Sequence, residues 1–121
     1  MKTDERMEAL LESGNIIEGH VYQDGKRHDM CFEGTPENIA SFIARHPYAE
    51  SILLLDELSL PVMDTFGWFI NKCEDKELLE QVKEHLIPMQ MGEAEPKEFF
   101  CPTAQETYAY SRQKDAGLTM C

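Results

Sequence analysis

The sequence predicts an α+β fold, in which a small antiparallel or mixed sheet packs with three to five helices. Two alternating runs, 16–22 and 26–32, flank an Asp-Gly pair, the dipeptide favoured by a type I′ hairpin turn. A third run, 51–58, has consecutive aliphatic residues and is typical of a central strand buried on both faces. Outside these runs, apolar residues recur at helical spacing after capping residues.

The two-residue turn at 24–25 sets the register of the predicted hairpin. In that register His20 faces Asp29 and Glu18 faces Cys31. One face is then apolar, and the other carries the polar side chains of Glu18, His20, Tyr22, Arg27 and Asp29. We interpret this polar face as cross-strand pairs worth about 0.2–1 kcal/mol each rather than as a binding patch. The sequence nearby supplies no nucleophile or third catalytic partner.

Two helices are predicted in the first half of the chain. The segment 3–13 has acidic residues at its start and apolar residues at helical spacing, and Gly14 closes it. This N-terminal segment, 1–14, either docks on the core or stays partly mobile. Thr35 and Pro36 begin the second helix, and Pro47 ends it. We expect this second helix to connect the hairpin to the central strand and to cover the sheet.

The second half is predicted to be helical with an acidic arm. Asp75 caps the most regular helix, which Pro88 ends. The segment 88–121 is predicted as an acidic arm followed by a last helix, which a capping box at 103–106 begins and Gly117 ends.

The segment 61–73 has a mixed signal. Val62, Phe66 and Phe69 belong to a helical stripe, whereas Gly67 and the aromatic content also suit a strand. A proline at the start and an aspartate near the positive end of the helix dipole favour a helix, which is our prediction here.

Length and composition predict one domain, 1–121, located in the cytoplasm. Hydrophobic residues make up 42% of the chain, enough for one ordinary core. The N-terminus lacks the apolar region of a secretory signal, and no apolar run approaches the length of a membrane span.

Charge restricts the class of partner. The chain has 23 acidic and 11 basic residues, for a formal net charge of -12. A protein with this negative charge repels phosphate backbones and anionic lipids and attracts basic surfaces. We therefore expect no direct nucleic-acid binding and no membrane binding, and a basic protein as the partner. The alternative is that the acidity only keeps the protein dispersed in solution.

No catalytic motif accompanies this charge. The sequence contains no nucleophile-elbow, zinc-protease, phosphate-loop or dinucleotide-binding pattern. Its four cysteines are scattered and form no C-x-x-C pair, so the sequence indicates neither a zinc ribbon nor a redox motif. We predict that the protein is not an enzyme and has no catalytic residue, metal site or cofactor.

The function predicted is that of a small inhibitor or regulator whose carboxylates occupy the basic nucleic-acid-binding groove of a partner protein. By size and charge it is analogous to DNA-mimic inhibitors of the anti-CRISPR or anti-restriction type, carried by phages and mobile elements. The predicted contact residues are Glu77, Glu80, Glu84, Glu93, Glu95 and Glu98.

Two alternatives stay open. In the first, the protein is an adaptor or structural domain that binds through an apolar patch containing Trp68, Met89 and Met91. In the second, it is a metal-dependent enzyme that uses carboxylates near the end of the central strand, Asp56, Glu57 and Asp64.

Overall fold

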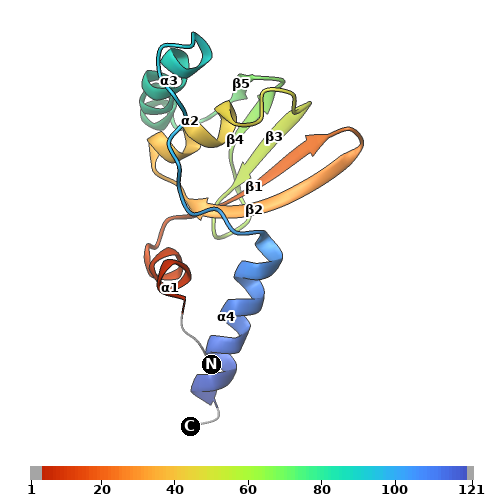
Figure 1. Cartoon of the computed structure of the whole chain (residues 1–121), viewed down its shortest axis with the longest axis vertical. Helices are drawn as coiled ribbons and strands as arrows, with labels where there is room; N and C mark the ends of the chain where they lie inside the picture. The colour runs from red at the N-terminus through yellow and green to blue at the C-terminus, as the bar shows by residue number, and fades with distance from the viewer. Residues whose placement is uncertain (1–3, 120–121) are drawn as a thin grey trace.

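A computed structural model describes the backbone of residues 4–119 and the side chains of residues 4–113 (Figure 1). The helices and strands follow in the order α1 (Glu5–Glu12), β1 (Ile16–Gln23), β2 (Lys26–Glu33), α2 (Pro36–Ala44), β3 (Ser51–Leu55), β4 (Pro61–Phe66), β5 (Phe69–Lys72), α3 (Lys76–Gln90) and α4 (Ala104–Thr119). This is an α+β fold, as predicted from the sequence. No helix in the described part of the chain is long and apolar enough to cross a membrane.

The five strands form one antiparallel sheet in the order β2-β1-β3-β4-β5. The hairpin of β1 and β2 has the predicted register, with His20 opposite Asp29 and Glu18 opposite Cys31. Its turn residues Asp24 and Gly25 have φ values of 54° and 74°. Positive φ at both central positions is what a type I′ turn requires, so the Asp-Gly pair explains the register.

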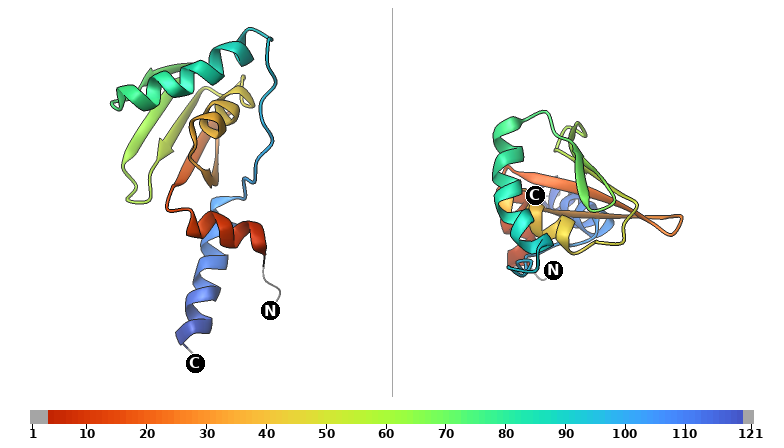
Figure 2. Two further views of the ribbon diagram at one scale, coloured as in Figure 1. Left: turned by 90° about the vertical axis from the view of Figure 1, so that its left-hand side faces the viewer. Right: turned by 90° about the horizontal axis from the view of Figure 1, so that it is seen from above.

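Helices α2 and α3 cover one face of the sheet (Figure 2). The two helices contribute Phe42 and Val82 to a core that contains Phe32 and Ile52 from the strands. The rings of Phe32 and Phe42 stack with centroids 4.7 Å apart. The core therefore lies between the α2–α3 layer and the inner face of the sheet.

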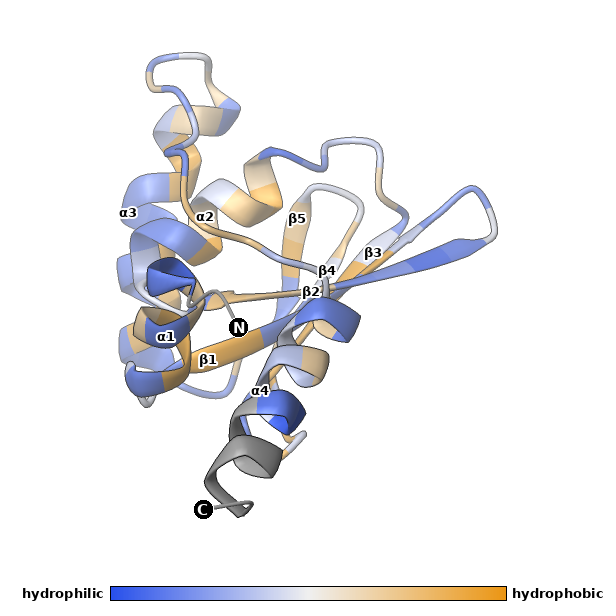
Figure 3. Cartoon of the chain, turned by 60° about the horizontal axis from the view of Figure 1, so that its bottom comes forward, coloured by the Kyte–Doolittle hydropathy of each residue, from blue (hydrophilic) through white to orange (hydrophobic). Residues whose placement is uncertain are grey.

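The second face of the sheet is covered only at one end. A smaller cluster joins Met7 and Leu10 of α1 to Cys31 of β2 and Ala104 of α4. Figure 1 shows both helices below the sheet, beside the ends of β1 and β2. The tip of the β1–β2 hairpin and the outer side of α3 are largely hydrophilic (Figure 3).

The predicted helix over 61–73 is wrong, because this segment forms the hairpin of β4 and β5. Met63 and Thr65 alternate with more exposed neighbours, and the Thr65 hydroxyl accepts a hydrogen bond from the Ile52 N–H at 3.0 Å. Gly67 lies in the turn with φ of 61°. Pairing with β3 satisfies the backbone of β4, and this tertiary effect outweighs the helical stripe.

Two predicted helix ends are also wrong. Pro88 lies inside α3, and the helix continues to Gln90 before Gly92, which has φ of 74°. Pro88 lacks the N–H that would donate to the preceding turn, so it removes one helical hydrogen bond. The Pro88 carbonyl still accepts from the backbone N–H groups of Glu93 and Ala94 beyond the helix end. Gly117 does not end the last helix, since α4 runs to Thr119. A glycine lowers helix propensity by about 1 kcal/mol but permits helical geometry.

Candidate functional site

Three of the predicted contact residues form a stripe on the solvent side of α3. Glu77, Glu80 and Glu84 are exposed, whereas Val82 and Leu86 on the opposite side are buried. Along the helix axis the three carboxylates are separated by about 4.5 and 6 Å, at 1.5 Å per residue. Within residues 4–113, no ion pair joins them to a cation. Their negative charge therefore faces solvent.

The other three predicted residues, Glu93, Glu95 and Glu98, are exposed in the connection between α3 and α4. This connection is tied to α2 at Lys97, whose N–H donates to the Ser41 hydroxyl at 2.8 Å and whose carbonyl accepts from Arg45 at 2.7 Å. Lys97 and Glu84 line one surface hollow, so the two groups of carboxylates occupy neighbouring surface. We call Glu77, Glu80, Glu84, Glu93, Glu95 and Glu98 the acidic surface.

The residues proposed for an apolar patch do not share one exposed surface. Trp68 and Met89 are partly buried and pack against the core, whereas Met91 is exposed. The Trp68 carbonyl accepts a hydrogen bond from the Gln90 side chain at 2.6 Å. The large exposed aromatic side chains of this region are instead Phe66 and Phe69.

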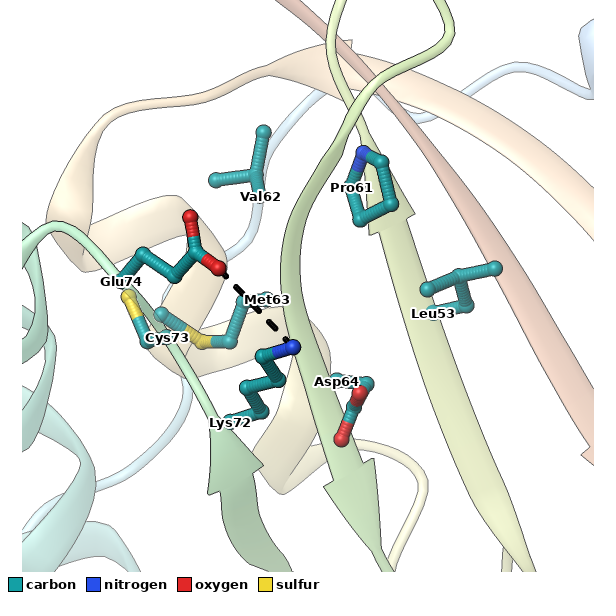
Figure 4. Close-up of a pocket in the computed structure, with 8 residues that line it drawn as sticks. All are labelled: Leu53, Pro61, Val62, Met63, Asp64, Lys72, Cys73 and Glu74. Atoms are coloured by element: carbon teal, nitrogen blue, oxygen red, sulfur yellow. Dashed lines mark ion pairs between the residues drawn. The ribbon is translucent and has the colours of Figure 1, made fainter.

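The structure does not gather Asp56, Glu57 and Asp64 into a metal site. Asp56 accepts from the backbone N–H groups of Leu58 and Leu60, so it stabilises its own turn. The Glu57 carboxylate accepts from the Ile16 N–H, and Asp64 accepts from Asn71 at 2.9 Å. Asp64 instead lines a hollow beside β4 and β5 with Lys72, Cys73 and Glu74 (Figure 4). Lys72 and Glu74 form an exposed ion pair at 3.8 Å there.

A different cluster lies on the second face of the sheet. His20 Nε2 is 2.5 Å from Glu18 Oε2 and 3.8 Å from Asp29 Oδ2. Their potential metal-ligating atoms all lie within 4.8 Å of one another, the one such group in the part of the chain that the structure describes. His20 is only 8% exposed. The polar face of the hairpin is thus partly enclosed by the protein.

Each of the two carboxylates of this cluster also accepts a hydrogen bond from a residue that is not part of the cluster. The Tyr108 hydroxyl of α4 donates to Glu18 Oε1, and Arg27 donates to Asp29 Oδ2 at 2.9 Å. Burial alone raises the pKa of Glu18. The hydrogen bonds from His20 and Tyr108, together with electrostatic attraction to His20 and Arg27, outweigh this effect and lower that pKa below its ordinary value.

Cys31 lies beside the cluster, opposite Glu18. Burial raises the pKa of this thiol to about 11, and the nearby carboxylates of Glu18 and Asp29 contribute in the same direction. The thiolate is therefore a minor form at neutral pH, and Cys31 is not an activated nucleophile. Cys73 and Cys101 are free thiols as well, and Cys121 lies outside the described residues.

Comparisons with known proteins add no functional assignment. No protein-family model matches the chain, and no curated protein or solved structure matches it.

The sequence places all three residues of this cluster on one face but gives no sign of the tyrosine that contacts Glu18. The hairpin register already places His20 opposite Asp29, with Glu18 on the same face. The contribution of Tyr108 was not predictable, because this residue lies 90 positions away from Glu18 in the sequence. The position of α4 over one end of the sheet depends on tertiary packing.

Proposed function

We propose that this protein binds a basic protein partner through the acidic surface and thereby occupies a groove that otherwise receives nucleic acid. The observation that supports this proposal most is the stripe of Glu77, Glu80 and Glu84, exposed on a rigid helix and without a cationic partner in the described residues. Carboxylates presented in this way are acceptors for Arg and Lys side chains.

The charge spacing suits a phosphate-binding surface in part. Phosphates follow one another at about 3.4 Å along the axis of one DNA strand, whereas the α3 carboxylates are separated by about 4.5 and 6 Å. The stripe is therefore less dense in charge than a DNA strand. The three carboxylates of the neighbouring connection add to the same field, and Lys97 between them subtracts from it.

The class of partner follows from this field. Closely spaced carboxylates attract a cluster of basic side chains and speed association with it. Such clusters line the grooves of nucleases and other proteins that bind nucleic acid. We therefore propose inhibition of a nucleic-acid enzyme by competition for its groove, as DNA-mimic inhibitors of restriction or CRISPR systems do.

The test is capture of a partner from a cell lysate by the tagged protein, followed by elution with duplex DNA or with salt. We expect a retained basic protein that both eluents release, because DNA competes for the groove and salt screens the contact. Capture of nothing, or of proteins that neither eluent releases, contradicts the proposal.

A charge-matched pair of variants separates the acidic surface from net charge. The triple variant Glu77→Gln, Glu80→Gln and Glu84→Gln should slow association with the captured partner at least about tenfold. The control removes three exposed carboxylates outside the acidic surface, on α1, on β2 and in the α2–β3 loop. This variant, Glu12→Gln, Glu33→Gln and Glu50→Gln, should bind nearly as the parent does. Equal loss in both variants would show that the location of the charges is irrelevant.

A further inference from the structure

We propose that Glu18, His20 and Asp29 bind one divalent transition-metal ion, with Zn²⁺ as its representative. This inference is independent of the proposed function, since the three residues lie on the sheet and not on the acidic surface. Imidazole and carboxylate are the nitrogen and oxygen ligands that such ions take from proteins. Three protein ligands leave a fourth position for water or another small ligand.

The hairpin backbone brings the three ligands together. His20 and Asp29 are directly opposite in the ladder, and Glu18 precedes His20 by two residues, so all three side chains leave the same face. The Asp24-Gly25 turn sets this register. The site is therefore present whenever the hairpin is formed, and its ligands need no rearrangement of the backbone.

The distances are close to those of a coordinated ion. With bonds of about 2.0–2.1 Å, two ligands of a tetrahedral ion lie about 3.4 Å apart. His20 Nε2 is 2.5 Å from Glu18 Oε2 and 3.8 Å from Asp29 Oδ2, so one distance must lengthen and the other shorten by less than about 1 Å. The ligand atoms of all three residues lie within 4.8 Å of one another, so the two carboxylates must also approach each other by at most about 1.4 Å.

Hydrogen bonds outside the cluster leave a ligand atom on each carboxylate. The Tyr108 hydroxyl donates to Oε1 of Glu18, so Oε2, which lies beside His20, is the oxygen that can bind an ion. Arg27 donates one hydrogen bond to Oδ2 of Asp29, which keeps a second lone pair for an ion, and Oδ1 is buried with no hydrogen-bond partner in the described residues. A buried, unpaired carboxylate oxygen is costly, and a cation would satisfy it. Outer-shell hydrogen bonds of this kind are typical of metal ligands in proteins.

The charges also favour a divalent cation. Two carboxylates and a neutral imidazole carry a formal charge of about -2, which a divalent ion balances. Arg27 offsets part of the charge of Asp29 from the solvent side. The protein as a whole has a net charge of -12, which adds a long-range attraction for cations.

The test is titration of the metal-free protein with Zn²⁺ alone by calorimetry, with Co²⁺ as a spectroscopic probe. We expect one Zn²⁺ per chain, a rise in melting temperature with Zn²⁺ concentration, and visible Co²⁺ bands of a nitrogen and oxygen site. No binding, or an intense thiolate charge-transfer band that assigns the metal to cysteines, overturns the proposal.

Variants locate the ion. His20→Asn and Asp29→Asn should each weaken Zn²⁺ binding at least about tenfold. The control is His85→Asn, which alters a half-exposed imidazole 3.7 Å from the Glu37 carboxylate and should leave binding unchanged. Circular dichroism of each variant checks its fold, and the Co²⁺ spectrum of the parent tests the ligand set without any variant. Binding that survives both cluster variants, or that is lost in the control, overturns the proposal.

Discussion

At Gly19 the core leaves no room for a side chain. A Cβ atom added there would lie 2.7 Å from Cε2 and Cζ of the Phe42 ring. Phe42 is only 1% exposed and stacks on Phe32, so the ring has little room to move away. The close approach of β1 to α2 therefore depends on the missing side chain at position 19.

We expect Gly19→Ala to lower the free energy of unfolding by about 1–3 kcal/mol, the usual cost of overpacking a core. Urea denaturation of the variant and the parent measures this difference. In the double variant Gly19→Ala with Phe42→Leu, the smaller side chain gives room to the new methyl group. The stability lost in Gly19→Ala alone and the stability lost in Phe42→Leu alone should therefore sum to more than the stability lost in the double variant. Simple additivity would show that Phe42 is not the obstacle.

At the scale of elements, α4 is joined to the sheet by few contacts. Thr103 caps α4, with its hydroxyl accepting from the Glu106 N–H at 3.1 Å. Met30 and Thr103 form an isolated bridge, and the Cys31 N–H donates to the Pro102 carbonyl at 2.9 Å. Further along the helix, Tyr108 binds Glu18 and Tyr110 binds Glu8 of α1. Polar contacts therefore contribute much of the docking of α4.

Tyr108→Phe should lower stability by about 0.5 kcal/mol at neutral pH, at the low end for a hydrogen bond because Tyr108 is half-exposed. The pKa of Glu18 is lowered in the folded protein. The ionised Glu18 carboxylate therefore contributes its full stabilisation of the fold above its ordinary pKa of 4.5, and this stabilisation is lost as the pH falls through the lowered pKa. The difference in the free energy of unfolding between Tyr108→Phe and the parent should therefore vanish at acidic pH. Urea denaturation at neutral and acidic pH measures it, and a difference independent of pH would contradict this role.

At the scale of the whole molecule, the net charge of -12 opposes folding through self-repulsion. The Debye length falls from about 30 Å at 0.01 M salt to about 10 Å at 0.1 M. We therefore expect the melting temperature to rise with NaCl over this range, as measured by differential scanning fluorimetry. The variant Glu12→Gln, Glu33→Gln and Glu50→Gln should show a smaller rise. A melting temperature that falls with salt would indicate that attractive ion pairs dominate instead.

Local signals in the sequence determined the β1–β2 hairpin and the starts of the helices. Asp24-Gly25 sets the hairpin register, and the Thr35 hydroxyl accepts from the Asn38 N–H at 3.2 Å, as its capping position predicts. Asp75 likewise accepts from the Leu78 N–H at 3.1 Å. Turns and caps are made by residues a few positions apart, so their chemistry is visible in the sequence.

The tertiary structure decided what depends on distant partners. The segment 61–73 forms two strands because β4 pairs with β3, and α3 continues past Pro88 to Gln90. The sequence predicted no metal site, and its carboxylate alternative at Asp56, Glu57 and Asp64 does not converge. The cluster of Glu18, His20 and Asp29 gains its enclosure from Tyr108, which α4 brings from the far end of the chain. Such contacts follow from packing of the whole fold, and no local pattern of residues encodes them.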